Sequence, residues 1–256
     1  MRQNSLRPCA AAVLLAAAVT ACSGDNVQVA SAPPADAKPV DLSKAGTLAG
    51  RVLLDGPAPA NAQIQMSADP FCIRANQHGA AFESFVSENG GLGNVFVYIK
   101  DGLGNYWVDM PSEPVTLDQN GCRYTPHVLG VRAGQTLEIT NSDETMHNVH
   151  ALAKVNGDFN FGQPIKGQTD RKTFASPEVM ITFKCNVHPW MNAYVGVVNH
   201  PYFAVTANEG GFQLKDVPAG TYTIEAWHEK LGSQSQTVTL GEKESKDISL
   251  TFKAVP

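Results

Sequence analysis

The sequence predicts an all-β protein built as a β-sandwich or as a pair of packed β-sandwiches. Helical periodicity is nearly absent, whereas apolar and polar residues alternate with a period of two in many short segments. Turn dipeptides such as Asp55-Gly56 and Asn120-Gly121 separate these segments. Short strands joined by frequent turns are typical of sandwiches, so we expect this fold class.

Alternation also predicts which side chains of one strand face the core. One face of the segment 179–185 carries three apolar side chains and a thiol, those of Val179, Ile181, Phe183 and Cys185. Because successive strand residues point to opposite faces, we expect the Cys185 sulfur at the core-facing end of this strand.

Composition excludes several functional classes. The 256 residues are 43% hydrophobic and 17% charged, which suits one large or two small globular domains. The net charge is −5 and the chain has no basic cluster, so we expect no nucleic-acid partner. No serine nucleophile elbow, HExxH motif or phosphate loop occurs.

The N-terminus has the features of an export signal. Arg2 and Arg7 precede a short apolar run that ends at Val19-Thr-Ala-Cys22. This ending resembles a bacterial lipobox, which implies a signal peptide over 1–22 and a lipidated Cys22 that anchors the protein to a membrane. Ser23 then favours the periplasmic face of the outer membrane. Simple cleavage, which would release a soluble periplasmic protein, is the alternative. Residues 23–45, rich in Ala, Pro and Ser, should form a flexible tether.

The cysteine count suggests one disulfide and one metal thiolate. Of the five cysteines, Cys9 leaves with the signal and Cys22 takes the lipid. If Cys72 pairs with Cys122, only Cys185 remains free in an oxidising compartment, where a metal would protect it. The alternative is that Cys72 and Cys122 are separate buried thiols.

Two short motifs supply a complete set of copper ligands. The first is Cys185-Asn-Val-His188-Pro-Trp-Met191, and the second is His147-Asn-Val-His150. A thiolate, two imidazoles and a thioether form a mononuclear blue-copper site, which holds one ion as Cu(I) or Cu(II). Zinc is the alternative metal, but structural zinc requires four strong donors and methionine is a poor one.

The segment 115–200 resembles the cupredoxin family of blue-copper proteins, in its amicyanin-like form. The resemblance lies in the spacing C-x-x-H-x-x-M, with Pro189 after the histidine and Trp190 before the methionine. It implies a Greek-key sandwich with a defined ligand set, namely His147, Cys185, His188 and Met191. It also implies that Asn148 supports the thiolate and its loop.

The resemblance decides between neighbouring candidates for each ligand. Residues three apart in a strand face opposite sides, so only one of His147 and His150 should bind copper, and the family pattern favours His147. Met146 is a rival to Met191. In the family the edge of the second histidine, here His188, passes through an apolar patch where redox partners dock. Trp190 should belong to that patch or fill the underside of the loop.

A second resemblance covers residues 201–256. The sequence from Gly210 to Tyr222 matches the G-x-F-x-L-x-x-V-P-x-G-T-Y pattern of carboxypeptidase-regulatory-like, transthyretin-like sandwiches with an Ig-like fold. The usual start of such a domain stands far upstream, at Thr47. We therefore expect 46–114 to contain that start together with the first cupredoxin strands. The copper domain is then either inserted into the second sandwich or packed tightly beside it.

These observations predict an exported, membrane-anchored blue-copper protein that carries single electrons between a donor and an acceptor redox protein. We expect neither an enzyme nor a small-molecule substrate, because the four copper ligands leave no open coordination position. One alternative is a periplasmic lipoprotein for copper trafficking or storage, although no Met-rich run is present. Another is a structural or glycan-contacting module with a non-redox copper site.

Overall fold

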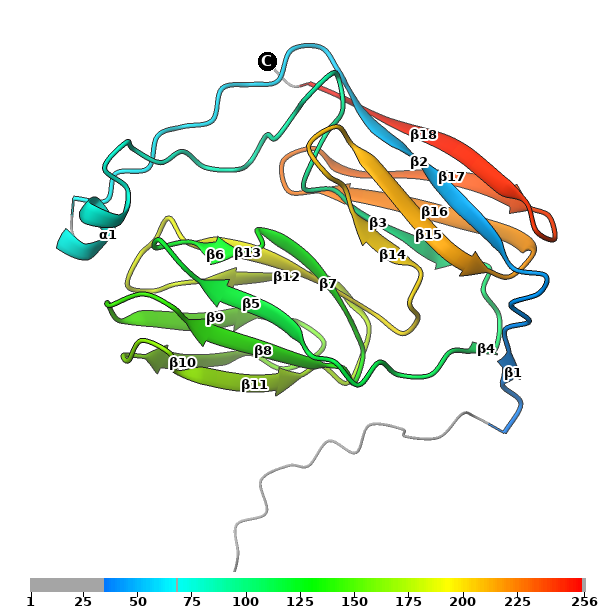
Figure 1. Ribbon diagram of the computed structural model, residues 1–256, viewed down its shortest axis with the longest axis horizontal. Helices are drawn as coiled ribbons and strands as arrows, with labels where there is room; N and C mark the ends of the chain where they lie inside the picture. Colours follow the sequence, from blue (N-terminus) through cyan, green and yellow to red (C-terminus); the bar gives the residue numbers. More distant parts are fainter. Residues whose placement is uncertain (1–34, 68, 255–256) are drawn as a thin grey trace, which may run out of the picture.

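The protein consists of two β-sandwiches that pack against each other, so the predicted all-β fold class is confirmed (Figure 1). The computed structural model describes residues 35–67 and 69–254. The signal peptide and Cys22 lie outside them. The elements of the described part are β1 (Lys38–Pro39), β2 (Gly46–Asp55), α1 (Pro70–Ala75), β3 (Phe96–Asp101), β4 (Tyr106–Trp107), β5 (Val115–Gln119), β6 (Tyr124–Thr125), β7 (Val128–Arg132), β8 (Thr136–Asn141), β9 (His147–Leu152), β10 (Phe159–Gln163), β11 (Thr169–Thr173), β12 (Glu178–Lys184), β13 (Asn192–Val198), β14 (Phe203–Val205), β15 (Gly211–Val217), β16 (Gly220–His228), β17 (Gly232–Leu240) and β18 (Ser245–Lys253).

The strands between residues 115 and 198 form what we call the central sandwich. One sheet has the order β10-β9-β12-β13-β7 and the other has the order β11-β8-β5-β6. Apolar side chains from both sheets, such as Leu137, Ile139 and Phe183, are fully buried between them. The alternating pattern of each strand therefore fills one common core.

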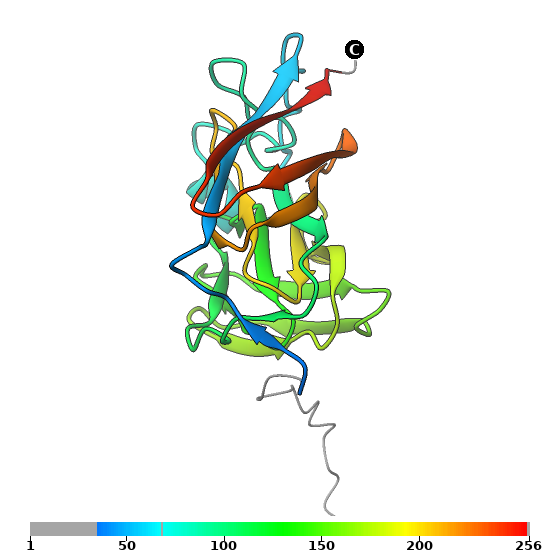
Figure 2. The same cartoon turned by 90° about the vertical axis from the view of Figure 1, so that its right-hand side faces the viewer.

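The flanking sandwich is assembled from both ends of the chain. Its sheets have the orders β14-β3-β16-β17 and β15-β2-β18. Strand β2 lies between β15 and the C-terminal β18, with which it pairs in parallel from Thr47 to Asp55. In Figure 2 these two strands, blue and red, run side by side above the green and yellow central sandwich. The central sandwich is thus inserted between β3 and β14 of the flanking one.

The segment 46–114 differs from expectation, because none of its described strands joins the central sandwich. β2 and β3 belong to the flanking sandwich, and the short β4 pairs with β1. The physical reason is that β2 and β3 bury their apolar faces in the flanking core, through Leu48, Val52 and Val97. Residues 61–67 and 69–85 instead pack against the core of the central sandwich, through Ile64, Met66 and Cys72.

The predicted tether is shorter than residues 23–45. Lys38 and Pro39 form a parallel pair with Tyr106 and Trp107, and the Lys38 amide donates to the Asn105 carbonyl at 2.8 Å. The described end of the tether is therefore fixed to the body. No helix within the described ranges is long and apolar enough to cross a bilayer.

The predicted alternation along β12 holds for three of four residues. Ile181, Phe183 and the following Cys185 are buried, but Val179 is exposed. The pairing of β12 with β13 shifts register between Glu178 and Ile181, and this irregularity turns Val179 outward.

The two sandwiches meet at a close contact between glycines and aromatic rings. Gly130 and Gly196 are paired opposite each other on β7 and β13, and the ring of Phe96 from β3 packs against both. A Cβ at Gly196 would lie 2.5 Å from Phe96, so only glycine permits this approach. Nearby, His127 of the central sandwich and Glu229 of the flanking one form a buried ion pair at 2.6 Å.

Candidate metal centre

The candidate centre lies at the end of β12, where Cys185 follows the last strand residue. Its side chain is 2% exposed and is the one free thiol among the described residues. The backbone amides of Asn148 and His188 point at the sulfur, at 3.4 and 3.3 Å. Burial alone would raise the pKa of Cys185, but hydrogen bonds from His147, His188 and these two amides lower it to about 6. The environment therefore favours a thiolate, the form that binds metals.

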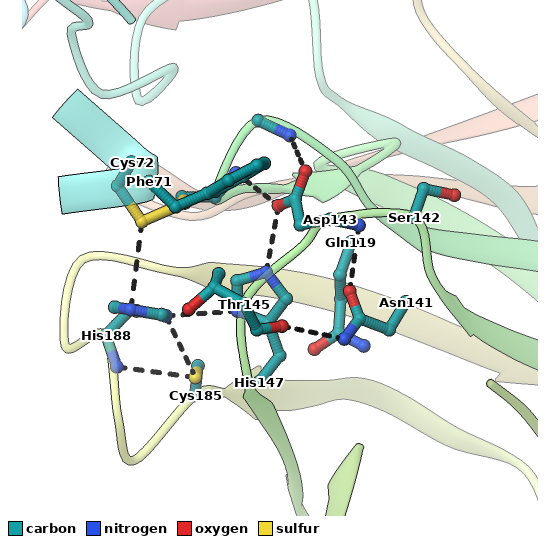
Figure 3. Close-up of polar contacts among 12 residues, drawn as sticks. Phe71, Cys72, Gln119, Asn141, Ser142, Asp143, Thr145, His147, Cys185 and His188 are labelled. Atoms are coloured by element: carbon teal, nitrogen blue, oxygen red, sulfur yellow. Dashed lines mark hydrogen bonds and ion pairs between the residues drawn. A yellow bond between two sulfur atoms is a disulfide. The ribbon is translucent and has the colours of Figure 1, made fainter. Parts of the chain in front are cut away.

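The two predicted imidazoles converge on this sulfur. The Nδ1 atoms of His147 and His188 lie 3.0 Å apart, and Nδ1 of His188 lies 3.9 Å from the Cys185 sulfur. One donor atom from each of the three residues falls within 4.8 Å of the others (Figure 3). All three side chains are buried. The structure therefore brings three of the four predicted ligands together in its interior.

Met191 closes the loop that carries Cys185 and His188. Its amide donates to the His188 carbonyl at 2.9 Å, and its carbonyl accepts from the Cys185 amide at 3.2 Å. Its side chain is 1% exposed and belongs to the central core, whereas the rival Met146 is 47% exposed. Burial in the same core cluster as Cys185 is compatible with Met191 as the thioether, whereas Met146 is exposed.

His147 is oriented by a carboxylate that the sequence analysis did not identify. Oδ2 of Asp143 lies 2.9 Å from Nε2 of His147, and the carboxylate also accepts from the amides of Gly121 and Cys122 at 2.8 and 2.7 Å. Burial alone would raise the pKa of Asp143, but these hydrogen bonds hold it below its ordinary value. An ionised Asp143 accepts from Nε2–H, which leaves a lone pair on Nδ1 directed at the centre.

Asn148 ties three segments together around the thiolate. Its Oδ1 accepts from the Asn186 amide at 3.0 Å, and its Nδ2 donates to the Phe161 carbonyl at 2.9 Å. These bonds link β9, β10 and residues 185–191, which we call the metal loop. Its supporting position matches the expectation from the family resemblance. His150 does not approach the centre, since its nearest polar partner is Oδ1 of Asn186 at 3.2 Å.

His188 differs from the family expectation of an exposed imidazole edge. It is 1% exposed, and its outer nitrogen Nε2 lies 3.0 Å from Oδ2 of Asp69 and 3.7 Å from the Cys72 sulfur. Cys72 is the buried residue of α1 and forms a disulfide with Cys122 (Figure 3). The family pattern could not anticipate this cover, because its residues lie upstream of the segment that carries the resemblance.

Trp190 fills the underside of the loop rather than forming an open apolar patch. Its Nε1 donates to the Cys122 carbonyl at 3.1 Å, and its ring centroid lies 5.0 Å from that of His188. The indole therefore joins the metal loop to the disulfide.

We call residues 61–85, apart from residue 68, the cover segment. Its ends are closed by two hydrogen bonds between Asn61 and the backbone of Phe85, at 2.8 and 2.9 Å. Asp69 caps α1 by accepting from the amides of Phe71 and Cys72. The sequence did contain a signal for this helix, since Asp followed by Pro is a typical helix start.

The chemistry of the donor set fits copper. If Asp69 and Asp143 both accept from Nε2–H, two Nδ1 lone pairs face each other at 3.0 Å, and a cation between them would remove their repulsion. A buried thiolate and two imidazoles, with the buried thioether of Met191 three residues after His188, provide soft and intermediate donors, the combination typical of blue-copper sites.

Comparison with known proteins finds solved structures that are similar to about a third of this chain. No protein-family model and no curated protein sequence matches the chain. A copper-containing nitrite reductase from Thermus scotoductus SA-01 is similar at 26% identity over 36% of this chain and 24% of its own, with a TM-score of 0.30. A mutant of amicyanin in its Cu(I) form is similar at 27% identity over 34% of this chain and 85% of its own, with a TM-score of 0.30. A purple cupredoxin from Nitrosopumilus maritimus is similar at 21% identity over 32% of this chain and 98% of its own, with a TM-score of 0.28. This chain spans about a quarter of the nitrite reductase, and the TM-scores are too low to carry an argument, so the proposals below rest on the site residues.

Proposed function

We propose that this protein is a copper-binding electron carrier. His147, Cys185, His188 and Met191 would hold one copper ion, which supplies a one-electron Cu(I)/Cu(II) couple when bound. The observation that supports this most directly is the convergence of two Nδ1 atoms and one thiol sulfur inside a buried site.

The surrounding residues supply what an electron carrier needs. Amides of Asn148 and His188 stabilise the thiolate, and carboxylates of Asp69 and Asp143 fix both imidazoles. Ligands held in this way change position little when the charge of the site changes, which keeps the barrier to electron transfer low. The enclosure of the ligands favours a carrier over an enzyme, because a substrate would have to enter a site that the cover segment closes.

The same enclosure argues against the copper-trafficking alternative. A protein that passes copper to partners needs ligands that incoming donors can reach, whereas Cys185, His188 and Met191 are each at most 2% exposed. Its partners would then be donor and acceptor redox proteins. The flanking sandwich would serve as a structural support.

The export signal and lipid anchor are part of the same proposal. Cys22 would carry the lipid, and the chain up to the β1–β4 pair would connect the body to the periplasmic face of the outer membrane. Cleavage without lipidation would instead give a soluble periplasmic protein. The mass of the mature N-terminal peptide distinguishes these forms.

The deciding experiment adds Cu(II) to the purified protein and records visible absorption and EPR spectra. We expect an intense blue band from thiolate-to-copper charge transfer, and Cys185→Ser should abolish it, because the serine hydroxyl cannot supply that transition. Voltammetry should then show a reversible one-electron couple. A colourless product, or copper spectra that Cys185→Ser leaves unchanged, would contradict the proposal.

A further inference from the structure

The outer nitrogen of His188 has a specific partner that lies 119 residues earlier in the chain. Nε2 of His188 lies 3.0 Å from Oδ2 of Asp69, and both side chains are largely buried, at 2% and 16% exposure. Within the described residues, this is the one ion pair that the Asp69 carboxylate makes within 4.0 Å. Its charge is therefore directed at a candidate copper ligand.

The position of Asp69 is fixed independently of His188. Its Oδ1 accepts from the amides of Phe71 and Cys72 at 2.7 and 3.3 Å, and its Oδ2 accepts from the Thr145 hydroxyl at 2.7 Å. The helix that it caps is joined to the central sandwich by the Cys72–Cys122 disulfide. The carboxylate is thus held in place before any metal binds, and no reorganisation is needed to engage the imidazole.

The contact has two chemical consequences for the ring. A carboxylate that accepts from Nε2–H fixes the tautomer in which Nδ1 carries a lone pair toward Cys185. It also increases the electron density on the imidazole, which stabilises the more highly charged metal state. The low exposure of both groups limits screening by solvent and salt.

We propose that Asp69 is a positioning residue of the copper centre, which fixes His188 through Nε2 and lowers the reduction potential by favouring Cu(II) over Cu(I). This inference rests on the proposed function. Asp69 lies outside the metal loop, and it would control how strongly the protein donates electrons. A site with this bias passes electrons to acceptors of higher potential.

The test replaces Asp69 by Asn, which remains a good helix cap but puts an uncharged, donating NH2 group in place of the Oδ2 atom that faces His188. We expect the blue band to remain and the Cu(II) affinity to fall about tenfold relative to that for Cu(I). A tenfold ratio corresponds to a rise of about 59 mV in the midpoint measured by voltammetry. Glu144→Gln is the matched control, because Glu144 is 68% exposed and pairs with Lys166 rather than with either imidazole.

A second variant moves the potential in the opposite direction. Thr145→Val removes the hydroxyl that shares Oδ2 of Asp69, so the carboxylate should bond His188 more strongly. We expect a lower midpoint than in the native protein. This variant keeps the test informative if Asp69→Asn does not fold.

The metal-free protein gives an independent readout. An NMR experiment that correlates ring nitrogens with their attached protons reports the tautomer of His188. We expect a single Nε2–H tautomer in the native protein and a mixture of Nε2–H and Nδ1–H tautomers in Asp69→Asn. An unchanged midpoint, a shift no larger than that of Glu144→Gln, or a loss of thermal stability alone would overturn the inference. If the native protein shows no blue band, the proposed function fails, and the tautomer measurement still decides whether Asp69 positions His188.

Discussion

Each imidazole at the centre is oriented by a carboxylate on its far side. Asp143 bonds Nε2 of His147, and Asp69 bonds Nε2 of His188, so both rings direct Nδ1 at the thiol. Asp143 lies four residues before the ring that it bonds, whereas Asp69 lies 119 residues before His188, at the start of α1. At the scale of residues, each carboxylate therefore selects which nitrogen of its ring stays free to bind a metal.

The two histidines of the upstream motif provide a matched pair for testing the ligand assignment. We expect His147→Ala to abolish the blue band and to weaken copper binding by more than about 100-fold, since loss of an outer partner alone costs about 10–100-fold. His150→Ala should leave both unchanged, because that ring contacts Asn186 instead. Visible spectra and copper titrations measure the outcome. Loss of the band in His150→Ala would contradict the assignment.

At the level of elements, the cover segment supplies what the strands of the central sandwich cannot. It adds Ile64, Met66 and Cys72 to the central core and brings Asp69 to His188. Its attachments include the Cys72–Cys122 disulfide and the bond from Asn76 to the Gly121 carbonyl at 3.0 Å. A segment with so short a helix depends on such cross-links for its position.

The disulfide should therefore contribute strongly to stability. Cys72 and Cys122 are 50 residues apart, and a loop of that length corresponds to about 4 kcal/mol in the chain-entropy description. We expect a double Cys72→Ser, Cys122→Ser variant to unfold at lower denaturant and to be cleaved by proteases within residues 61–85. A reductant should lower the denaturant midpoint of the native protein to that of the variant. It should leave the midpoint of the variant unchanged. Equal stability of the two proteins would refute this role.

At the level of the whole molecule, two sandwiches are joined by an insertion and a tight interface. The parallel pairing of β2 with β18 joins the two halves of the flanking sandwich on either side of the inserted one in the chain. The interface depends on Gly130 and Gly196, which admit the ring of Phe96. The His127–Glu229 pair adds a polar contact next to Asn192 of β13.

The close approach at the interface can be tested with two alanine substitutions. Gly196→Ala places a Cβ 2.5 Å from Phe96, so we expect a loss of about 1–3 kcal/mol in the free energy of unfolding. Gly211→Ala is the matched control, because a Cβ there meets nothing within 4 Å. Denaturant titrations followed by fluorescence and circular dichroism measure both. If the two variants are equally stable, the interface is looser than the structure shows.

Local patterns in the sequence predicted much of the central sandwich and the inner donors. The spacing of Cys185, His188 and Met191 confines three donors to one short loop, and strand alternation turns Cys185 inward, because these relations depend on neighbours in the chain. The all-β class followed from the same short-range periodicity. Alternation mispredicted Val179, where a register shift with β13 intervenes.

Only the tertiary structure decided what surrounds those donors. Asp69 and His188 meet across 119 residues, and β2 pairs with a strand at the opposite end of the chain. Such contacts depend on how whole elements bury their apolar faces, and no local spacing encodes them. The sequence by itself therefore determined the fold class and predicted which residues are candidate ligands. The fold decided that the second imidazole is covered, and that a largely buried carboxylate at the start of a disulfide-linked helix contacts it.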